Sequence, residues 1–404
     1  MATVRPFRAW LPPAARVAEI ASVPYDVVST DEARALAAGK PDSFLHVIRP
    51  EIDLPEGTSL YSDAVYEQAR RNLEDWIARV PFTAADTPRL FVYRLVRDGR
   101  SQVGVVGGCS VDEYDDGRIA IHERTRQKKE DDRTRHVVTM RCQAEPIFLA
   151  YRAVPAIDVL VAGVMEQAPL FDFVAPDGVS HTLWEVTDAA ALAAAFEAVP
   201  TLYVADGHHR TKSASRARAT LRDANPDHTG AEAYNSVLSV VFPDDQLQIL
   251  PYNRVVTDLG GRTPAQILAA IGERYPLRAG ADPSPAARHD FAVFADGAWH
   301  GFTIPPTGDG VIERLDVSLL QDQVLAPLLG ITDPRTDPRI DFVGGIRGTD
   351  ELAARATACG GVAFSLYPTS LAELFAVADS GAIMPPKSTW FEPKLRSGLF
   401  LHRI

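Results

Sequence analysis

The sequence has few cysteines and no long hydrophobic run. Cys109, Cys142 and Cys359 are its three cysteines, and they form neither a CxxC pair nor a zinc-type Cys/His spacing. This argues against a disulfide framework and favours a reducing compartment. The apolar stretch 154–164 is interrupted by Asp158 and is too short to span a bilayer. The N-terminus lacks the pattern of a secretion signal. We therefore expect a cytoplasmic protein without a membrane partner.

Positive charge is also in deficit, with 41 Lys and Arg against 53 Asp and Glu and a net charge of −12. Broad nucleic-acid binding requires a dense basic surface, so the composition argues against a nucleic-acid partner. The apolar content of 46% and the charged content of 23% are typical of a globular protein. In such an acidic chain, a local cluster of cations is more informative than it would be in a basic one.

Three common catalytic motifs are absent. The sequence has no GxxxxGK[ST] loop, no GxGxxG after a strand and no GxSxG nucleophile elbow. The chain therefore lacks the signatures of a P-loop ATPase, a Rossmann dehydrogenase and an α/β hydrolase.

Strand-like and helical patterns alternate along the chain. The strand-like runs include residues 90–96, 103–109, 147–151, 181–186, 202–205 and 235–242, and the helical patterns include residues 61–77, 156–167, 189–198 and 208–224. This alternation predicts an α/β (α+β) fold with mixed sheets flanked by helices. After Pro251 the loops become richer in proline and glycine. We therefore expect a core over residues 1–250 and a C-terminal α/β region over residues 251–404.

A strand-turn-helix pattern at residues 202–224 is the most informative local feature. An apolar run ends at Asp206-Gly207, and a helical pattern follows. The first turn of that helix carries His208, His209, Arg210 and Lys212. Cations at a helix N-terminus oppose the helix dipole, so they suggest an anionic ligand that compensates them. An exposed basic helix start explains the same residues without a ligand.

A second candidate lies at His122-Glu123, where a strand-like run ends. Ligands of α/β sheets bind at strand ends, which favours a functional role for Glu123. The charged run that follows, up to Arg133, also fits a solvated helix stabilised by ion pairs such as Lys128 with Asp132. A zinc-protease motif is excluded because position 126 is arginine rather than histidine.

A third candidate is the segment 383–398 near the C-terminus. Its prolines restrict the backbone, and four side chains offer donors suited to phosphate or carboxylate: Lys387, Ser388, Thr389 and Lys394. A tail that merely docks onto the body of the protein is the alternative. The Asp341–Gly345 segment, a strand running into two glycines, fits a tight turn better than a phosphate loop.

Five motifs occur in an order that resembles a bacterial and archaeal family, domain of unknown function 1015. They are Val-Pro-Tyr-Asp-Val-Val (23–28), His-Glu-Arg-Thr (122–125), Glu-Asp-Asp-Arg (130–133), Ala-Asp-Gly-His-His-Arg (205–210) and Met-Pro-Pro-Lys-Ser-Thr (384–389). The resemblance covers essentially the whole chain. It departs at Asn253-Arg254, where the family pattern has His-Arg, and this weakens any role assumed for that position.

Asp206–Arg210, with Ala214 after it, also resembles the signature of the ParB/sulfiredoxin superfamily, whose turn and helix hold nucleotide phosphates. Sulfiredoxin chemistry is excluded because His208 stands where the catalytic cysteine would be. The turn is most similar to that of the free serine kinases. The resemblance implies a ParB/sulfiredoxin-like nucleotide-binding core with large insertions, because Glu123 and Asp206 lie much farther apart here than in the small kinases.

This resemblance implies a kinase that transfers a phosphoryl group from ATP or ADP, with Mg²⁺, to free L-serine or a related hydroxy-amino acid. The implied catalytic residues are Glu123, Asp206 and His209. The implied phosphate-binding residues are Gly207, His208, Arg210 and Arg133, and the implied substrate-binding residues are Lys387, Ser388, Thr389 and Lys394. A ParB-like regulatory protein that binds a nucleotide without transferring its phosphate is the alternative.

Overall fold

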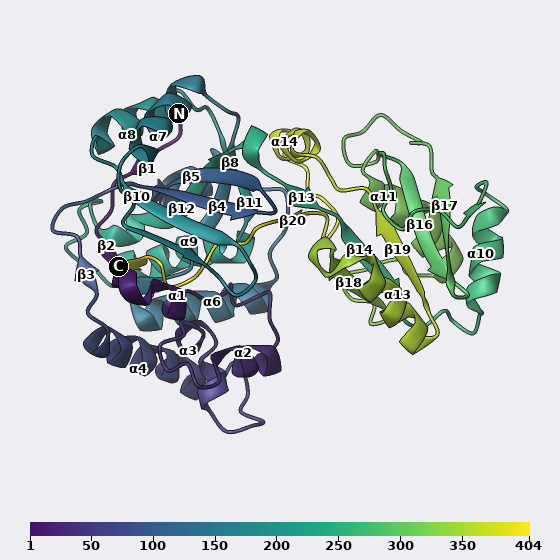
Figure 1. Ribbon diagram of the computed structural model, residues 1–404, viewed down its shortest axis with the longest axis horizontal. Coiled ribbons are helices and arrows are strands. Elements are labelled where there is room, and N and C mark those ends of the chain that lie inside the picture. The colour runs from purple at the N-terminus through teal and green to yellow at the C-terminus, as the bar shows by residue number, and fades with distance from the viewer. The chain divides into compact units, whose positions relative to one another are not determined.

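The alternating patterns of the sequence fold into mixed sheets flanked by helices, in a computed structural model that describes residues 1–404 (Figure 1). The predicted α/β class is confirmed. The chain divides into two units. The first unit consists of Met1–Ile121, Thr125–Leu247 and Pro393–Ile404, and the second unit consists of His122–Arg124 and Gln248–Glu392.

The first unit is built on a nine-stranded sheet. Its order is β6-β11-β8-β12-β5-β4-β10-β9, with β1 beside β5. The strands are β1 (Val4–Arg5), β4 (Phe91–Arg97), β5 (Arg100–Ser110), β6 (Ile119–Ala120), β8 (Ile147–Tyr151), β9 (Phe171–Val174), β10 (Ser180–Glu185), β11 (Leu202–Asp206) and β12 (Ser236–Pro243). β12 pairs parallel to β8 and antiparallel to β5. The near-continuous apolar runs of β8 and β12 are typical of strands buried on both faces.

The first unit also contains nine α-helices. They are α1 (Val17–Ile20), α2 (Thr30–Ala37), α3 (Leu45–Ile48), α4 (Asp63–Arg79), α5 (Val111–Asp115), α6 (Gln127–Met140), α7 (Pro155–Met165), α8 (Ala189–Phe196) and α9 (His208–Asp223). α4 buries Val65, Ala69, Leu73 and Trp76 on one face, as the helical spacing predicts. α2 begins with a capping box between Ser29 and Glu32.

A small sheet ties both ends of the chain to the first unit. Its order is β3-β2-β21-β7, formed by β2 (Ala9–Leu11), β3 (Thr83–Ala84), β7 (Cys142–Gln143) and the C-terminal β21 (Leu401–Arg403). Ser22 and Ser397 also form an antiparallel bridge. The C-terminal segment from Pro393 onward is therefore an integral part of the first unit.

The second unit has a six-stranded antiparallel sheet of order β15-β17-β16-β19-β14-β18. The strands of the whole unit, including two outside this sheet, are β13 (Ile249–Leu250), β14 (Tyr252–Val256), β15 (Arg278–Ala279), β16 (Asp290–Ala295), β17 (Ala298–Thr303), β18 (Ile340–Gly344), β19 (Val362–Leu366) and β20 (Trp390–Phe391). Its helices are α10 (Pro264–Gly272), α11 (Asp316–Leu320), α12 (Ala326–Leu329), α13 (Gly348–Cys359) and α14 (Leu371–Asp379). β13 and β20 pair apart from the sheet.

One local expectation differs from the structure. The charged run from Glu123 to Arg133 fits a helix, but α6 begins only at Gln127, so Glu123 lies in the segment before the helix. In the second unit, a turn of π-helix over Gln321–Leu325 separates α11 from α12. None of the helices combines the length and the apolar character that a membrane crossing requires.

Candidate functional site

β11 and α9 meet at Asp206-Gly207, so the predicted strand-turn-helix is confirmed. Gly207 has a φ of 100°, a backbone conformation that favours glycine. A Cβ at this position would lie 3.1 Å from Arg210 Nε. Glycine is therefore required both by the turn's conformation and by the close approach of the arginine beneath it.

The N-terminus of α9 presents backbone donors at this turn. The first helical hydrogen bond runs from Thr211 N–H to Gly207 O at 2.9 Å. The N–H groups of His208, His209 and Arg210 precede that bond and belong to the first turn, whose backbone N–H groups point toward the N-terminal end of the helix. Donors of this kind, together with the positive end of the helix dipole, suit a phosphate or carboxylate group.

Asp206 lies at the end of β11 between two cations. Lys394 Nζ is 3.2 Å from its Oδ2, and Arg210 Nη2 is 3.5 Å from the same atom. The surrounding protein opposes ionisation of Asp206, but Lys394 and then Arg210 outweigh it and hold the pKa of the carboxyl well below its usual range. Asp206 is therefore a carboxylate at neutral pH and a weak proton acceptor. The catalytic role that the resemblance implies for Asp206 stays a prediction.

The two histidines of the turn differ in environment. His208 is buried, and burial lowers its pKa to about 3, so its imidazole is neutral at physiological pH. His209 is partly exposed, and its Nε2 accepts a hydrogen bond from the backbone N–H of Arg126 at 3.1 Å. A neutral His209 consequently carries its proton on Nδ1. Of the two, His209 is the one accessible to a ligand.

Arg210 turns inward from the start of α9. Its Nη1 donates to Pro146 O at 2.6 Å, and its side chain is only 8% exposed. Asp206 and the buried Glu145 keep its pKa raised although burial opposes the charged form. Arg210 thus fixes the turn against β8 from below. Its predicted contact with a phosphate stays a prediction.

Arg133 is buried close to this arginine. Its Nε donates to Asp132 Oδ2 at 2.9 Å, its Nη1 is 3.8 Å from Glu145 Oε2, and its guanidinium carbon lies 4.3 Å from the Tyr25 ring centroid. Glu145, whose pKa is raised by burial, also accepts a hydrogen bond from the Tyr25 N–H at 3.2 Å. A cavity of about 30 Å³, room for one or two water molecules, is lined by Arg133, Glu145 and Arg210.

Tyr25 and Glu145 belong to this cluster but were not among the predicted site residues. The signal for Tyr25 was the Val-Pro-Tyr-Asp motif at 23–26, which was quoted only as part of the family resemblance. Glu145 stands alone between a polar segment and a strand, and no spacing distinguishes it from a solvated acid. Its burial is a consequence of the tertiary structure.

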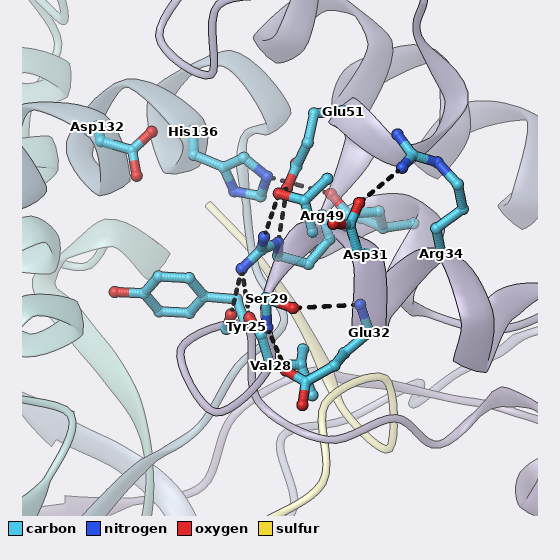
Figure 2. Close-up of polar contacts among 12 residues, drawn as sticks. Tyr25, Val28, Ser29, Asp31, Glu32, Arg34, Arg49, Glu51, Asp132 and His136 are labelled. Atoms are coloured by element: carbon cyan, nitrogen blue, oxygen red, sulfur yellow. Dashed lines mark hydrogen bonds and ion pairs between the residues drawn. The ribbon is translucent and has the colours of Figure 1, made fainter. Parts of the chain in front are cut away.

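The loop that carries Tyr25 is held by one arginine, as Figure 2 shows. Arg49 Nη1 donates to the carbonyl oxygens of Tyr25 and Val28, both at 2.8 Å, and its Nε donates to Glu51 at 2.7 Å. Its Nη2 donates to Thr30 Oγ1 at 2.8 Å. Because all three nitrogens of the planar Arg49 guanidinium form hydrogen bonds, this side chain fixes the loop. The Tyr25 ring is thereby held against Arg133.

The predicted substrate-binding residues are divided between the two units. Lys394 belongs to the first unit, beside Asp206, whereas Lys387, Ser388 and Thr389 belong to the second. Ser388 is buried and its Oγ donates to Pro385 O at 2.7 Å, so it stabilises its own loop. Their role in substrate binding stays a prediction.

The same loop of the second unit lies beside the His122-Glu123 pair. Thr389 Oγ1 is 3.2 Å from His122 Nε2, and Met384 N–H donates to His122 O at 2.8 Å. Residues more than 260 positions apart are therefore in contact. Glu123 follows directly and is partly exposed. The structure thus joins two of the predicted stretches in the second unit, while the Asp206–Arg210 turn lies in the first.

The sequence matches, over residues 4–318, the family described as "Protein of unknown function (DUF1015)". No curated protein matches it. Three solved structures are similar to parts of the chain. A free serine kinase in complex with AMP is 15% identical with a TM-score of 0.35, covering 71% of this chain and 86% of its own. C-terminally truncated SbnI from Staphylococcus aureus is 13% identical with a TM-score of 0.38, covering 72% and 85%. A conserved hypothetical protein from Pyrococcus furiosus is 15% identical with a TM-score of 0.35, covering 73% and 93%.

Proposed function

The chain belongs to the DUF1015 family, and since that family name assigns no activity, we propose one from the site. We propose that the protein is a small-molecule kinase that transfers a phosphoryl group from ATP or ADP to the hydroxyl of free L-serine or a related hydroxy-amino acid. The observation that carries the proposal is the Asp206-Gly207 turn, where α9 begins and the Lys394 ammonium contacts the Asp206 carboxylate.

The turn has the parts that phosphoryl transfer needs. Such transfer depends mainly on positioning and on stabilising the charge of the phosphoryl oxygens, with little covalent work by the protein. The N–H groups of His208, His209 and Arg210 and the Lys394 side chain supply the donors. His209, accessible and anchored through its Nε2, supplies a further donor at Nδ1.

A magnesium ion fits this donor set as part of a nucleotide complex. Mg²⁺ is usually held by one or two carboxylates together with substrate phosphates, and Asp206 offers one ionised carboxylate at the turn. When bound, the ion would neutralise charge on the phosphates. Asp206 would hold it, and Lys394 would then be released toward the phosphate oxygens.

We assign the proton-accepting role to Glu123. In the proposed reaction the acceptor hydroxyl oxygen bonds to the terminal phosphorus, the bond from that phosphorus to the bridging oxygen breaks, and the hydroxyl proton passes to the Glu123 carboxylate. The assignment rests on the position of Glu123 shortly after strand β6, because ligands of α/β sheets commonly bind at strand ends.

The proposal is tested by incubating the purified full-length protein with ATP or ADP, Mg²⁺ and a panel of free amino acids. We expect an O-phospho product with serine or a related hydroxy-amino acid. If no acceptor supports nucleotide turnover, the kinase proposal is wrong. A nucleotide-induced rise in melting temperature without any product would instead favour the regulatory alternative.

The role of Glu123 has its own test. Glu123→Gln should abolish transfer, by a factor of at least about 100, because a general base contributes about 10²–10⁴-fold. Nucleotide binding should remain nearly intact, since the amide preserves the shape of the side chain. Glu56→Gln, at an exposed loop position, is the matched control and should keep full activity. If Glu123→Gln retains the full rate, Glu123 is not the base.

A further inference from the structure

The first unit contains a second and much larger cavity, of about 580 Å³. It shares no residue with the Asp206–Arg210 turn. Its walls come from the segments 18–23 and 36–45, from Pro176 and Asp177, and from Arg396 near the C-terminus. Cavities that bind small organic molecules commonly have volumes of about 300–1,000 Å³. The size is therefore that of a ligand site rather than of a packing defect.

The wall formed by residues 39–45 is held in place by hydrogen bonds from outside it. Phe44 N–H donates to Ile20 O at 3.0 Å, Trp76 Nε1 donates to Asp42 O at 3.1 Å, and Arg79 Nη2 donates to Pro41 O at 3.0 Å. Phe44 and Trp76 also pack edge to face, with ring centroids 5.0 Å apart. The cavity is consequently preformed, which lowers the entropic cost of binding.

Most of the lining is apolar, and it includes Ala18, Ala21, Val23, Leu36 and Leu45. Leu36, on α2, is 42% exposed and contributes apolar surface to this lining. A ligand with an apolar body would cover this surface. The walls alone do not determine what its polar end would be.

Arg396 supplies the polar end. Its side chain is only 5% exposed, yet it lines the cavity. Its Nη2 is 2.5 Å from Asp177 Oδ2, and its Nε donates to His181 Nε2 at 3.3 Å. His181 must therefore carry its proton on Nδ1, which lies 2.6 Å from the Tyr93 hydroxyl. The fully buried His181 ring, itself held by Tyr93, thus fixes the Arg396 guanidinium.

Asp177 is the exchangeable member of this network. It belongs to the turn between β9 and β10, and its side chain is 44% exposed. A ligand carboxylate would bond to the same guanidinium in the bidentate geometry that arginine favours. Displacing Asp177 costs little, because an exposed carboxylate is readily solvated.

The charges around the cavity favour an anion. Asp42 is shared by two arginines, Arg16 and Arg79. The cationic groups on the lining residues and their partners are Arg16, Lys40, Arg79 and Arg396, and the anionic groups are Glu19, Asp42 and Asp177. One positive charge is thus in excess, in a chain whose net charge is −12.

From this combination we propose that the cavity is a binding site for a small amphiphilic carboxylate, with its apolar body against Ala21 and Leu36 and its head on Arg396 in place of Asp177. The site is separate from the proposed phosphoryl transfer. It would hold the same ligand whether or not the protein is a kinase.

Isothermal titration of the full-length protein with octanoate tests this site, with octanol and octylammonium as probes of the same chain length. We expect one octanoate per chain, bound at least tenfold more tightly than either comparison compound. Equal affinity for octanol or octylammonium would overturn the assignment of Arg396. Absence of octanoate binding up to millimolar concentration would overturn the site itself.

A pair of matched variants locates the binding. Leu36→Glu places a negative charge on the lining and should weaken octanoate binding at least tenfold, whereas Val159→Glu, at another exposed apolar helix position, should leave it unchanged. Ala21→Phe, which fills the cavity without altering charge, should weaken octanoate and octanol alike. Arg396→Gln should remove the preference for octanoate over octanol. Unchanged octanoate affinity in both Leu36→Glu and Ala21→Phe contradicts the proposal.

Discussion

The two units bury positive charge in opposite ways. In the first unit, Arg133 lies between Asp132 and Glu145, and Arg210 lies beside Asp206. In the second unit, Arg254 is buried with the carbonyl oxygens of Tyr252 and Pro386 and the Phe342 ring as its partners. Burial raises the cost of its charge and lowers its pKa to about 9. The first unit thus builds a compensated ionic cluster, whereas the second unit holds the Arg254 cation by carbonyl dipoles.

The difference indicates which unit carries a functional constraint on its buried charged groups. A buried ion pair is rarely better for stability than apolar residues of the same size, so a cluster of several pairs next to a glycine turn suggests a functional constraint. In the second unit the partners of Arg254 are carbonyl oxygens rather than a carboxylate, and the buried polar groups on the same sheet, Asn253 and Ser365, are uncharged. Four predictions test this contrast, from the largest expected effect to the smallest.

Arg133→Met should destabilise the first unit by about 3–5 kcal/mol, because it leaves the buried carboxylates of Asp132 and Glu145 without their cation. Arg135→Met, two residues along the same helix, should cost less than about 1 kcal/mol, because Arg135 is exposed and pairs with the exposed Asp63. The measurement is urea unfolding followed by hydrogen exchange of first-unit peptides. Equal losses in the two variants would mean that the cluster is not energetically special.

Acid should weaken the first unit through its buried histidines. Burial lowers the pKa of His136 and His208 to about 3 and that of His402 to about 4. A histidine that is neutral when folded stabilises the fold above the ordinary pKa of about 6.5, and this stability is lost as the pH falls from 6.5 toward the folded value. Each such group should therefore contribute a slope of about 1.4 kcal/mol per pH unit below pH 6.

His136→Gln tests this slope, since glutamine can still donate to Val47 O as His136 does at 3.1 Å. The variant should lose about 1.4 kcal/mol per pH unit of the acid dependence between pH 6 and pH 4. Hydrogen exchange of second-unit peptides in the same samples is the internal control. An unchanged pH dependence of first-unit exchange would contradict the neutral state of His136.

Gly207→Ala should destabilise the first unit by about 2 kcal/mol, because φ is positive and the new methyl group meets Arg210 and Ile147. Gly178 also has a positive φ, but a methyl group there would meet no other atom, so Gly178→Ala should lower the free energy of unfolding by only about 1 kcal/mol. Thermal unfolding of the two variants measures the difference. If both lose the same stability, the close approach of Arg210 to the turn is unimportant.

Arg254→Met should change the stability of the second unit by less than about 1 kcal/mol, because the loss of two carbonyl partners is offset by removal of an uncompensated buried charge. Hydrogen exchange of peptides from β14 and β18 provides the measurement. A loss as large as that of Arg133→Met would show that the two units do not differ in how they stabilise a buried cation.

Local features were predictable from the sequence because short-range physics determines them. The apolar run at 202–205, the breaking Asp206-Gly207 pair and the following helical pattern predicted β11, the turn and α9. The capping box of Ser29 and Glu32 at the start of α2 is a feature of the same local kind. At Glu123 the same reasoning was wrong, because a run of charges fits a solvated helix and gives no sign that α6 begins only at Gln127.

Contacts between distant segments were decided only by the tertiary structure. Asp206 and Lys394 are 188 positions apart, and no spacing rule relates them. Which of two similar carboxylates meets a buried arginine, as Glu145 meets Arg133, depends on the elements that pack around it. The sequence by itself determined the strand, the turn and the donors of the candidate phosphate site. The tertiary structure decided that Lys394 is the cation beside Asp206 and that Arg210 turns inward, because the packing of β8 and the C-terminal segment positions both.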